Sequence, residues 1–163
     1  MFNLRTLLNS VRSLVPVLIA QNRPAALVLT TSLAGLVSLP TSGSYTVSKA
    51  AAIVLARVLR VELASVAPEL RVACLAPAMV RTNLARTTAA QQLESLPADA
   101  ELVEQTHTAM ITHGTPPDEV ARWVLEALDQ GRFWVLSPAK NPYMRILADE
   151  LDELTKAMNA VIE

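Results

Sequence analysis

The sequence predicts an α/β fold in which about three parallel strands form an open sheet between flanking helices. Three observations lead to this prediction. Short apolar runs without alternation recur along the chain, and such runs are typical of strands buried on both faces of a parallel sheet. The longer segments between them repeat apolar residues every three or four positions, as amphipathic helices do. Proline and glycine mark most boundaries, so helix and strand alternate along the chain.

The first half of the chain holds two helices and one strand. Apolar residues at three- and four-residue intervals predict a helix over residues 3–20, which the Asn-Arg-Pro segment at 22–24 ends. Residues 25–30 are an apolar run without alternation and predict the first strand. After a loop that contains two glycines, a long helix is expected over residues 45–66, and Pro68 closes it.

The second half continues the alternation. A polar, alanine-rich segment interrupts it, and we expect helical patches there in a lid or substrate loop. Proline and acidic residues begin the helix that follows, and a glycine ends it, as helix boundaries favour. In order, the expected elements are a strand at 70–75, the polar segment at 83–112, a helix at 116–130, a strand at 133–136 and an amphipathic helix at 142–158.

Length and composition exclude several classes of protein. With 163 residues, 52% hydrophobic and 18% charged, the chain suits a single domain over residues 1–163 and is too apolar to be disordered. A formal net charge of −1 gives no attraction for nucleic acid or an anionic membrane. Cys74 is the single cysteine, which excludes a disulfide framework. No apolar run is long enough to span a membrane, so we expect a soluble protein, and the lone cysteine fits a cytoplasmic location.

Tyr45 and Lys49 are the first candidates for chemistry. They are four residues apart at the start of the long predicted helix, so their side chains rise from one face, about 5.4 Å apart along its axis. A phenol is a poor base at neutral pH, but a nearby cation favours its phenolate form. Ser32 follows the first strand, where open parallel sheets place their ligands, and could donate to a carbonyl oxygen. Tyr45 is therefore a candidate general acid and base.

These residues resemble a known family, the short-chain dehydrogenase/reductases, over its carboxyl-terminal two-thirds and over nearly the whole of this chain. Ser32 is followed thirteen residues later by Tyr45 and then by Lys49, in the family's order. The segment at 77–82 is similar to the family's Pro-Gly-x-x-x-Thr, with alanine in place of the usual glycine. Asn3 falls where the family keeps its catalytic asparagine. The resemblance implies a Rossmann-like fold.

The resemblance also implies an oxidoreductase that moves a hydride between a nicotinamide cofactor and a small alcohol or ketone. In the family the tyrosine passes a proton to or from the substrate oxygen, and the lysine holds the nicotinamide ribose and favours the phenolate. The serine polarises the carbonyl, and the asparagine holds a water that links the lysine to solvent. By this resemblance the catalytic residues are Asn3, Ser32, Tyr45 and Lys49, and the cofactor-binding residues are Tyr45, Lys49, Pro77, Val80 and Thr82.

The implied cofactor is NAD or NADP, and the sequence does not distinguish the two. Dinucleotides need a glycine-rich turn for the pyrophosphate and an acidic or basic residue that selects the ribose substituent. The four glycines of this chain are isolated, so the amino-terminal cofactor-binding segment of the family is missing. We therefore expect an incomplete Rossmann-like domain, from a truncated gene product or a truncated gene model, that is weak or inactive alone. Its uncovered strand edge and apolar faces are expected to reduce its solubility.

Two other functions remain open, and a metal site is not expected. In the family the helix that holds the tyrosine and the one that follows the asparagine pack against a partner subunit, so the chain could be a non-enzymatic remnant that still forms a homo-oligomer. An epimerase or dehydratase of the same fold would use the same Tyr/Lys pair. His107 and His113 lack neighbours in any metal-ligand pattern. The residues Leu33, Leu36, Val37, Leu39 and Leu84 suggest an apolar substrate pocket.

Overall fold

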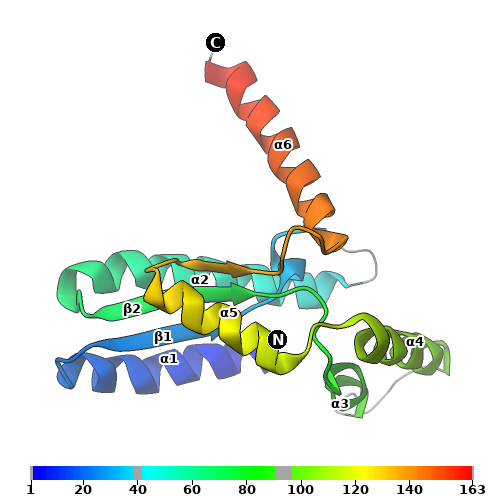
Figure 1. Cartoon of the computed structure of the whole chain (residues 1–163), viewed down its shortest axis with the longest axis horizontal. Coiled ribbons are helices and arrows are strands. Elements are labelled where there is room, and N and C mark those ends of the chain that lie inside the picture. Colours follow the sequence, from blue (N-terminus) through cyan, green and yellow to red (C-terminus); the bar gives the residue numbers. More distant parts are fainter. Residues whose placement is uncertain (1, 39–41, 91–96, 163) are drawn as a thin grey trace. The chain divides into compact units, whose positions relative to one another are not determined.

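The computed structural model describes residues 2–38, 42–90 and 97–162 (Figure 1). The chain forms two compact units, one made of Met1–Ala78 with Val124–Glu163 and the other of Met79–Trp123. Each unit is described by itself. The single domain expected over residues 1–163 stays a prediction, whereas the open parallel sheet expected within it is confirmed in the first unit.

Three parallel strands form this sheet. They are β1 (Ala25–Thr30), β2 (Leu70–Ala76) and β3 (Trp134–Leu136), in the order β1-β2-β3. Leu27 is opposite Val72 in the first pair and Leu75 is opposite Val135 in the second. All three strands begin and end within one residue of the predicted bounds, because unbroken apolar runs with proline or glycine nearby are a strong strand signal.

Two long helices pack with the sheet around one hydrophobic core. They are α1 (Phe2–Ala20) and α2 (Gly43–Val66), drawn in dark blue and cyan-green (Figure 1). The core joins apolar residues of β1, β2 and α2, and the predicted apolar stripe of α1 packs against it. The buried members are Leu27, Leu29, Ile53, Ala56, Leu59, Leu63, Leu70, Cys74 and Phe133, and the α1 residues against them are Leu7, Val11, Val15 and Leu18.

The prediction that β1 is buried on both faces is wrong for the described chain. Leu27 and Leu29 are buried, but Ala26 is exposed and Val28 is only half-buried. The strand lies at the edge of the sheet, with β2 on one side. β2 matches the expectation better, because four consecutive residues from Ala73 to Ala76 are buried. β2 is the central strand and pairs on both sides, whereas β1 pairs with β2 alone, so the described chain supplies fewer neighbours that could cover β1.

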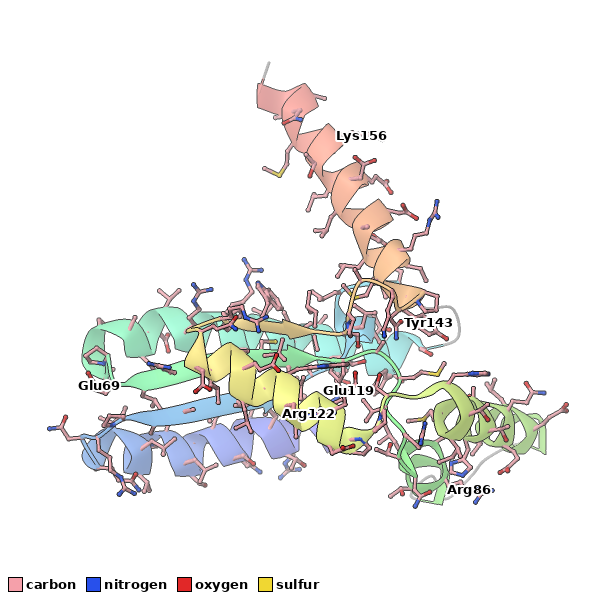
Figure 2. The ribbon with its side chains drawn as sticks, in the orientation of Figure 1. Glu69, Arg86, Glu119, Arg122, Tyr143 and Lys156 are labelled. Carbon is pink, nitrogen blue, oxygen red and sulfur yellow. The ribbon has the colours of Figure 1, made fainter. Side chains whose placement is uncertain are left out.

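The carboxyl-terminal part of the first unit contains the end of α5 (Pro117–Asp129) and then α6 (Tyr143–Ile162). Gly131 has φ 65° and ends α5, with its N–H donating to Leu128 O at 3.1 Å and the Arg132 N–H donating to Ala127 O at 2.7 Å. This is a Schellman ending, which requires a left-handed residue that glycine adopts without strain. Tyr143 lies in the first turn of α6 (Figure 2). Leu147 of the same helix is buried.

The second unit is more helical than the sequence predicts. It contains α3 (Leu84–Ala90) and α4 (Pro97–His113) where a loop with helical patches is expected. The apolar residues of α4 are few and scattered, so periodicity underestimates a helix that runs for 17 residues. Arg86 on α3 (Figure 2) forms an ion pair with Glu104 on α4 at 2.7 Å. This contact between the two helices is not visible in sequence spacing.

Within the described residues, no helix combines the length and apolar character needed to cross a membrane.

Candidate active site

The first turns of α2 place Tyr45 and Lys49 side by side. Lys49 Nζ lies 5.6 Å from the centre of the Tyr45 ring, as expected for residues four apart on one helix face. Both side chains are half-buried. Burial lowers the pKa of the Lys49 ammonium from its ordinary value of 10.5, because removal from water penalises the charged form. The pair is therefore a cation and a phenol held together at the partly buried end of a helix.

Lys49 also borders a cavity of about 270 Å³. Hydroxyl groups from three elements line the cavity, and Leu7 and Ala52 complete its wall. The Ser10 and Ser48 hydroxyls donate to Thr6 O at 3.0 Å and Tyr45 O at 2.7 Å, so they offer a ligand acceptor lone pairs. Acceptors of this kind beside an ammonium donor suit a ligand rich in hydroxyl groups. The hydroxyl residues are Thr6 and Ser10 of α1, Thr30 of β1 and Ser48 of α2.

Ser32 lies directly after β1 and begins the short helix η1 (Leu33–Gly35). Its Oγ accepts a hydrogen bond from the Ala34 N–H at 3.2 Å. The side chain therefore caps η1, and because it acts there as acceptor, its hydroxyl proton stays available for a second partner. Ser32 is half-buried at the carboxyl end of the strand, the position predicted from the sequence.

Gly35 brings the Ser32 loop against the first turns of α2. A Cβ atom at this position would stand 2.6 Å from the Lys49 carbonyl carbon and 2.8 Å from the Ala50 nitrogen. No side chain fits in that space, so only glycine allows η1 to rest on the helix turn that carries Lys49. The sequence shows Gly35 as a loop glycine, and its packing role emerges only in the structure.

Hydroxyl side chains also form hydrogen bonds between the segments that follow the strands. The buried Thr31 Oγ1 donates to Leu75 O at 2.9 Å, which links the end of β1 to β2. Ser137, buried after β3, accepts from the Ala78 N–H at 2.9 Å. Neither residue was singled out by sequence reasoning, although a hydroxyl at the carboxyl end of a buried strand is a usable signal.

Pro77 joins the same network. Its carbonyl accepts from the Leu33 N–H at 2.9 Å, so the loop after β2 is bound to the loop that begins with Ser32. The structure therefore brings Ser32, Lys49 and Pro77 into one region of the first unit, together with Tyr45. Asn3 lies in α1, and its side chain is outside the described residues.

Val80 and Thr82 belong to the second unit. Val80 forms an isolated parallel bridge with Thr115, made by the Met79 carbonyl and the Arg81 N–H, so the Val80 amide takes no part in it. Thr82 Oγ1 accepts from the Leu84 N–H at 3.4 Å, at the start of α3. This contact corresponds to the helix-cap role of a threonine.

The leucines and valine proposed to line an apolar pocket have mixed positions. Leu33 and Val37 are buried in a cluster with Leu147 of α6, so they pack the core of the first unit. Leu36 packs at the edge of that cluster, whereas Leu84 is exposed in the second unit and Leu39 is outside the described residues. Across the described ranges, no group of three potential metal ligands is present.

Comparison with known families identifies the chain. The family model described as short chain dehydrogenase matches residues 1–93. A CLA biosynthesis dehydrogenase/reductase of Lactiplantibacillus plantarum is 29% identical over 151 residues, which cover 86% of this chain and 52% of that protein. An uncharacterised oxidoreductase of Listeria innocua is 31% identical over 128 residues, covering 78% of this chain and 48% of its own length. The chain thus spans about half the length of the curated relatives it matches.

Solved structures agree with this family. A short-chain dehydrogenase/reductase of Burkholderia phymatum in complex with NAD aligns with a TM-score of 0.79 and 27% identity, over 91% of this chain and 53% of its own. LigO of Sphingobium sp. strain SYK-6, in its apo form, aligns with a TM-score of 0.67 and 25% identity, over 99% of this chain and 50% of its own. The Rossmann-like fold expected from the sequence is therefore confirmed, and the chain belongs to the short-chain dehydrogenase family.

Proposed function

We propose that this chain carries the catalytic half of an oxidoreductase that moves a hydride between NAD(P) and an alcohol or carbonyl substrate. The observation that carries the proposal is the juxtaposition of Tyr45 and Lys49 beside the Ser32 loop, with Gly35 as the close-packed contact. Membership of the short-chain dehydrogenase family supports an oxidoreductase. The Burkholderia phymatum protein binds NAD, which favours a nicotinamide cofactor here as well.

The nicotinamide end of the cofactor fits the residues present. The cavity beside Lys49 offers four hydroxyl side chains and an ammonium, which suit the hydroxyls of a ribose. Lys49 would hold that ribose, and Pro77 would border the nicotinamide. The family motif assigns Val80 and Thr82 to the nicotinamide as well. When bound, the nicotinamide supplies or accepts the hydride. The chain contains four isolated glycines and no glycine-rich turn for a pyrophosphate.

Tyr45 is the proposed general acid and base. Its phenol oxygen would give a proton to a carbonyl oxygen in reduction or take one from a hydroxyl in oxidation. The Lys49 ammonium, 5.6 Å from the ring, stabilises the negative charge that develops on the phenol oxygen when the proton leaves. A partly buried setting strengthens that attraction relative to bulk water. Asn3 would hold a water that connects Lys49 to solvent.

Ser32 is the proposed positioning group for the substrate oxygen. Because its Oγ accepts from the Ala34 N–H, the direction of the side chain is restrained, and the hydroxyl proton can be donated outward. A hydrogen bond to a carbonyl oxygen polarises the bond and favours hydride addition at carbon. The capping contact thus serves catalysis as well as the local fold.

The test is a titration of the purified chain with NADH and NADPH, followed by cofactor fluorescence. Saturable binding of either cofactor supports the proposal, and the tighter one identifies the preferred nicotinamide nucleotide. Net consumption of the reduced cofactor with a carbonyl substrate separates a dehydrogenase from an epimerase or dehydratase, which would regenerate its cofactor in each turnover. Absence of binding at millimolar cofactor would overturn the enzymatic function for this chain alone.

A second function, a non-enzymatic remnant that self-associates, has one observation in its favour. Four valines form an exposed apolar stripe along α2. Such a stripe is typical of a helix that packs against another chain. Dimers that never bind reduced cofactor would support this function over the first. The valines are Val47, Val54, Val58 and Val61, between 43% and 74% exposed.

A further inference from the structure

A second cavity, of about 260 Å³, lies in the first unit at the amino ends of the strands, whereas Ser32 lies at a carboxyl end. It opens where β2 begins and just before β3, whereas Ser32 follows the carboxyl end of β1. Late residues of α2 and the last turn of α5 complete its wall. This site is therefore separate from the Tyr45 and Lys49 pair.

Three arginines, Arg60, Arg71 and Arg132, line this cavity, and no acidic side chain of the described residues does. None of the three guanidinium groups forms an ion pair with a described carboxylate. Glu69 stands in the turn before β2 (Figure 2) but is not part of the cavity wall. Three arginines therefore line one cavity, and none of them has an ion-pair partner among the described residues.

Contacts other than carboxylates hold two of the three guanidinium groups, those of Arg60 and Arg71. The Arg60 guanidinium lies 4.8 Å from the centre of the Phe133 ring, in a cation–π contact. Arg71 donates to Leu128 O at the carboxyl end of α5, where the helix dipole is negative. Arg132 follows the Schellman ending, and its backbone N–H donates to Ala127 O at 2.7 Å. Arg71 thus serves the helix end, and Arg60 and Arg132 remain for a ligand.

The rest of the wall is apolar. Leu70 and Phe133 are each 6% exposed, and they lie beneath the arginines with Val72 beside them. A planar guanidinium binds carboxylate and phosphate oxygens through paired N–H groups, and all three arginines are exposed and therefore accessible to a solute. A cavity of this volume is below the usual range for ligand pockets, so it fits a small molecule.

We propose that this cavity binds a small organic dianion, a phosphate monoester or a dicarboxylate, whose oxygens meet Arg60 and Arg132 and whose carbon part rests on Leu70 and Phe133. Two charges on the ligand match the two guanidinium groups that no helix end uses. The site does not depend on the proposed hydride transfer, because it lies at the amino ends of the strands and uses none of the same residues.

The test is isothermal titration calorimetry of the full chain at low ionic strength with phenyl phosphate, with succinate and with the monoanion benzoate. We expect saturable 1:1 binding of phenyl phosphate or succinate, and the tighter of the two identifies the ligand class. Arg132→Gln should weaken that binding about tenfold, since it removes a charge-assisted hydrogen bond. Arg132→Lys should restore part of it, because the charge returns without the planar fork.

Arg57→Gln is the matched control. Arg57 is exposed on the same helix as Arg60 but does not line the cavity, so its replacement should change the affinity less than twofold. Circular dichroism of each variant reports whether the fold persists. The proposal is overturned if no dianion binds saturably, if benzoate binds as tightly as the dianions, or if the Arg57 and Arg132 variants lose affinity equally.

Discussion

The phenol oxygen of Tyr45 is the one atom that the proposed reaction uses to move a proton. Tyr45→Phe removes it and keeps the ring beside Lys49, so turnover of any substrate should fall about 10²- to 10⁴-fold, the range for loss of a general acid or base. Tyr143→Phe, at the first turn of α6, is the control and should retain activity. Steady-state consumption of reduced cofactor is the measurement, and an unimpaired Tyr45→Phe variant would refute the mechanism.

The lowered pKa of Lys49 has a consequence for stability. In the unfolded chain this lysine holds its proton up to about its ordinary value of 10.5, but in the folded chain it releases the proton at lower pH. Between the two values the unfolded state binds more protons, so the contribution of Lys49 to stability improves as pH rises and is worst below the folded pKa. Burial of the charged form is the physical cost.

Lys49→Met should therefore stabilise the chain at pH 7, and the gain should shrink as pH approaches 10. Urea unfolding at both pH values measures it. Lys140→Met is the control, because Lys140 is exposed and its replacement should have little effect at either pH. A Lys49→Met variant that is equally stable to the wild type at both pH values would contradict the desolvation of Lys49.

The contact between η1 and α2 depends on the missing side chain of Gly35. Gly35→Ala places a Cβ 2.6 Å from the Lys49 carbonyl carbon, so the elements must separate, and we expect a loss of about 1–3 kcal/mol in the free energy of unfolding. Gly43→Ala is the matched control, since no atom lies within 4 Å of its added Cβ and alanine favours a helix. Chemical denaturation of both variants decides: equal stability would show that the contact is loose.

Elements with a strong local signal were predictable, and those that depend on a neighbour were not. Unbroken apolar runs marked the three strands, and the stripe of Leu7, Val11 and Val15 marked the face of α1 that packs against the core. The helix α4 has no such pattern and is held in part by the Arg86–Glu104 pair, which joins residues far apart in sequence. The edge position of β1 likewise follows from strand order, which local pattern does not contain.

Self-association of the whole chain is expected to use the valine stripe of α2. Val54→Asp with Val58→Asp places two charges in that stripe, where they would be costly to bury, so the apparent molecular mass should fall to that of a monomer. Val66→Asp, on the same helix and 63% exposed but off the stripe, should leave the mass unchanged. Light scattering after size-exclusion chromatography measures both. A wild-type chain that is already monomeric would remove the basis for the remnant function.

By itself the sequence determined the parallel α/β fold and the Tyr45–Lys49 pair, because each follows from spacing along the chain: strand runs, helix periodicity and residues one turn apart. Its motifs also carried the resemblance to the family. Only the tertiary structure decided which residues far apart in the sequence are in contact. It showed that Gly35 seats the Ser32 loop on α2, that Thr31 and Ser137 fasten the strand ends, and that three arginines from separate elements surround one cavity. Contacts between distant residues arise from packing of whole elements, and local pattern carries no record of that packing.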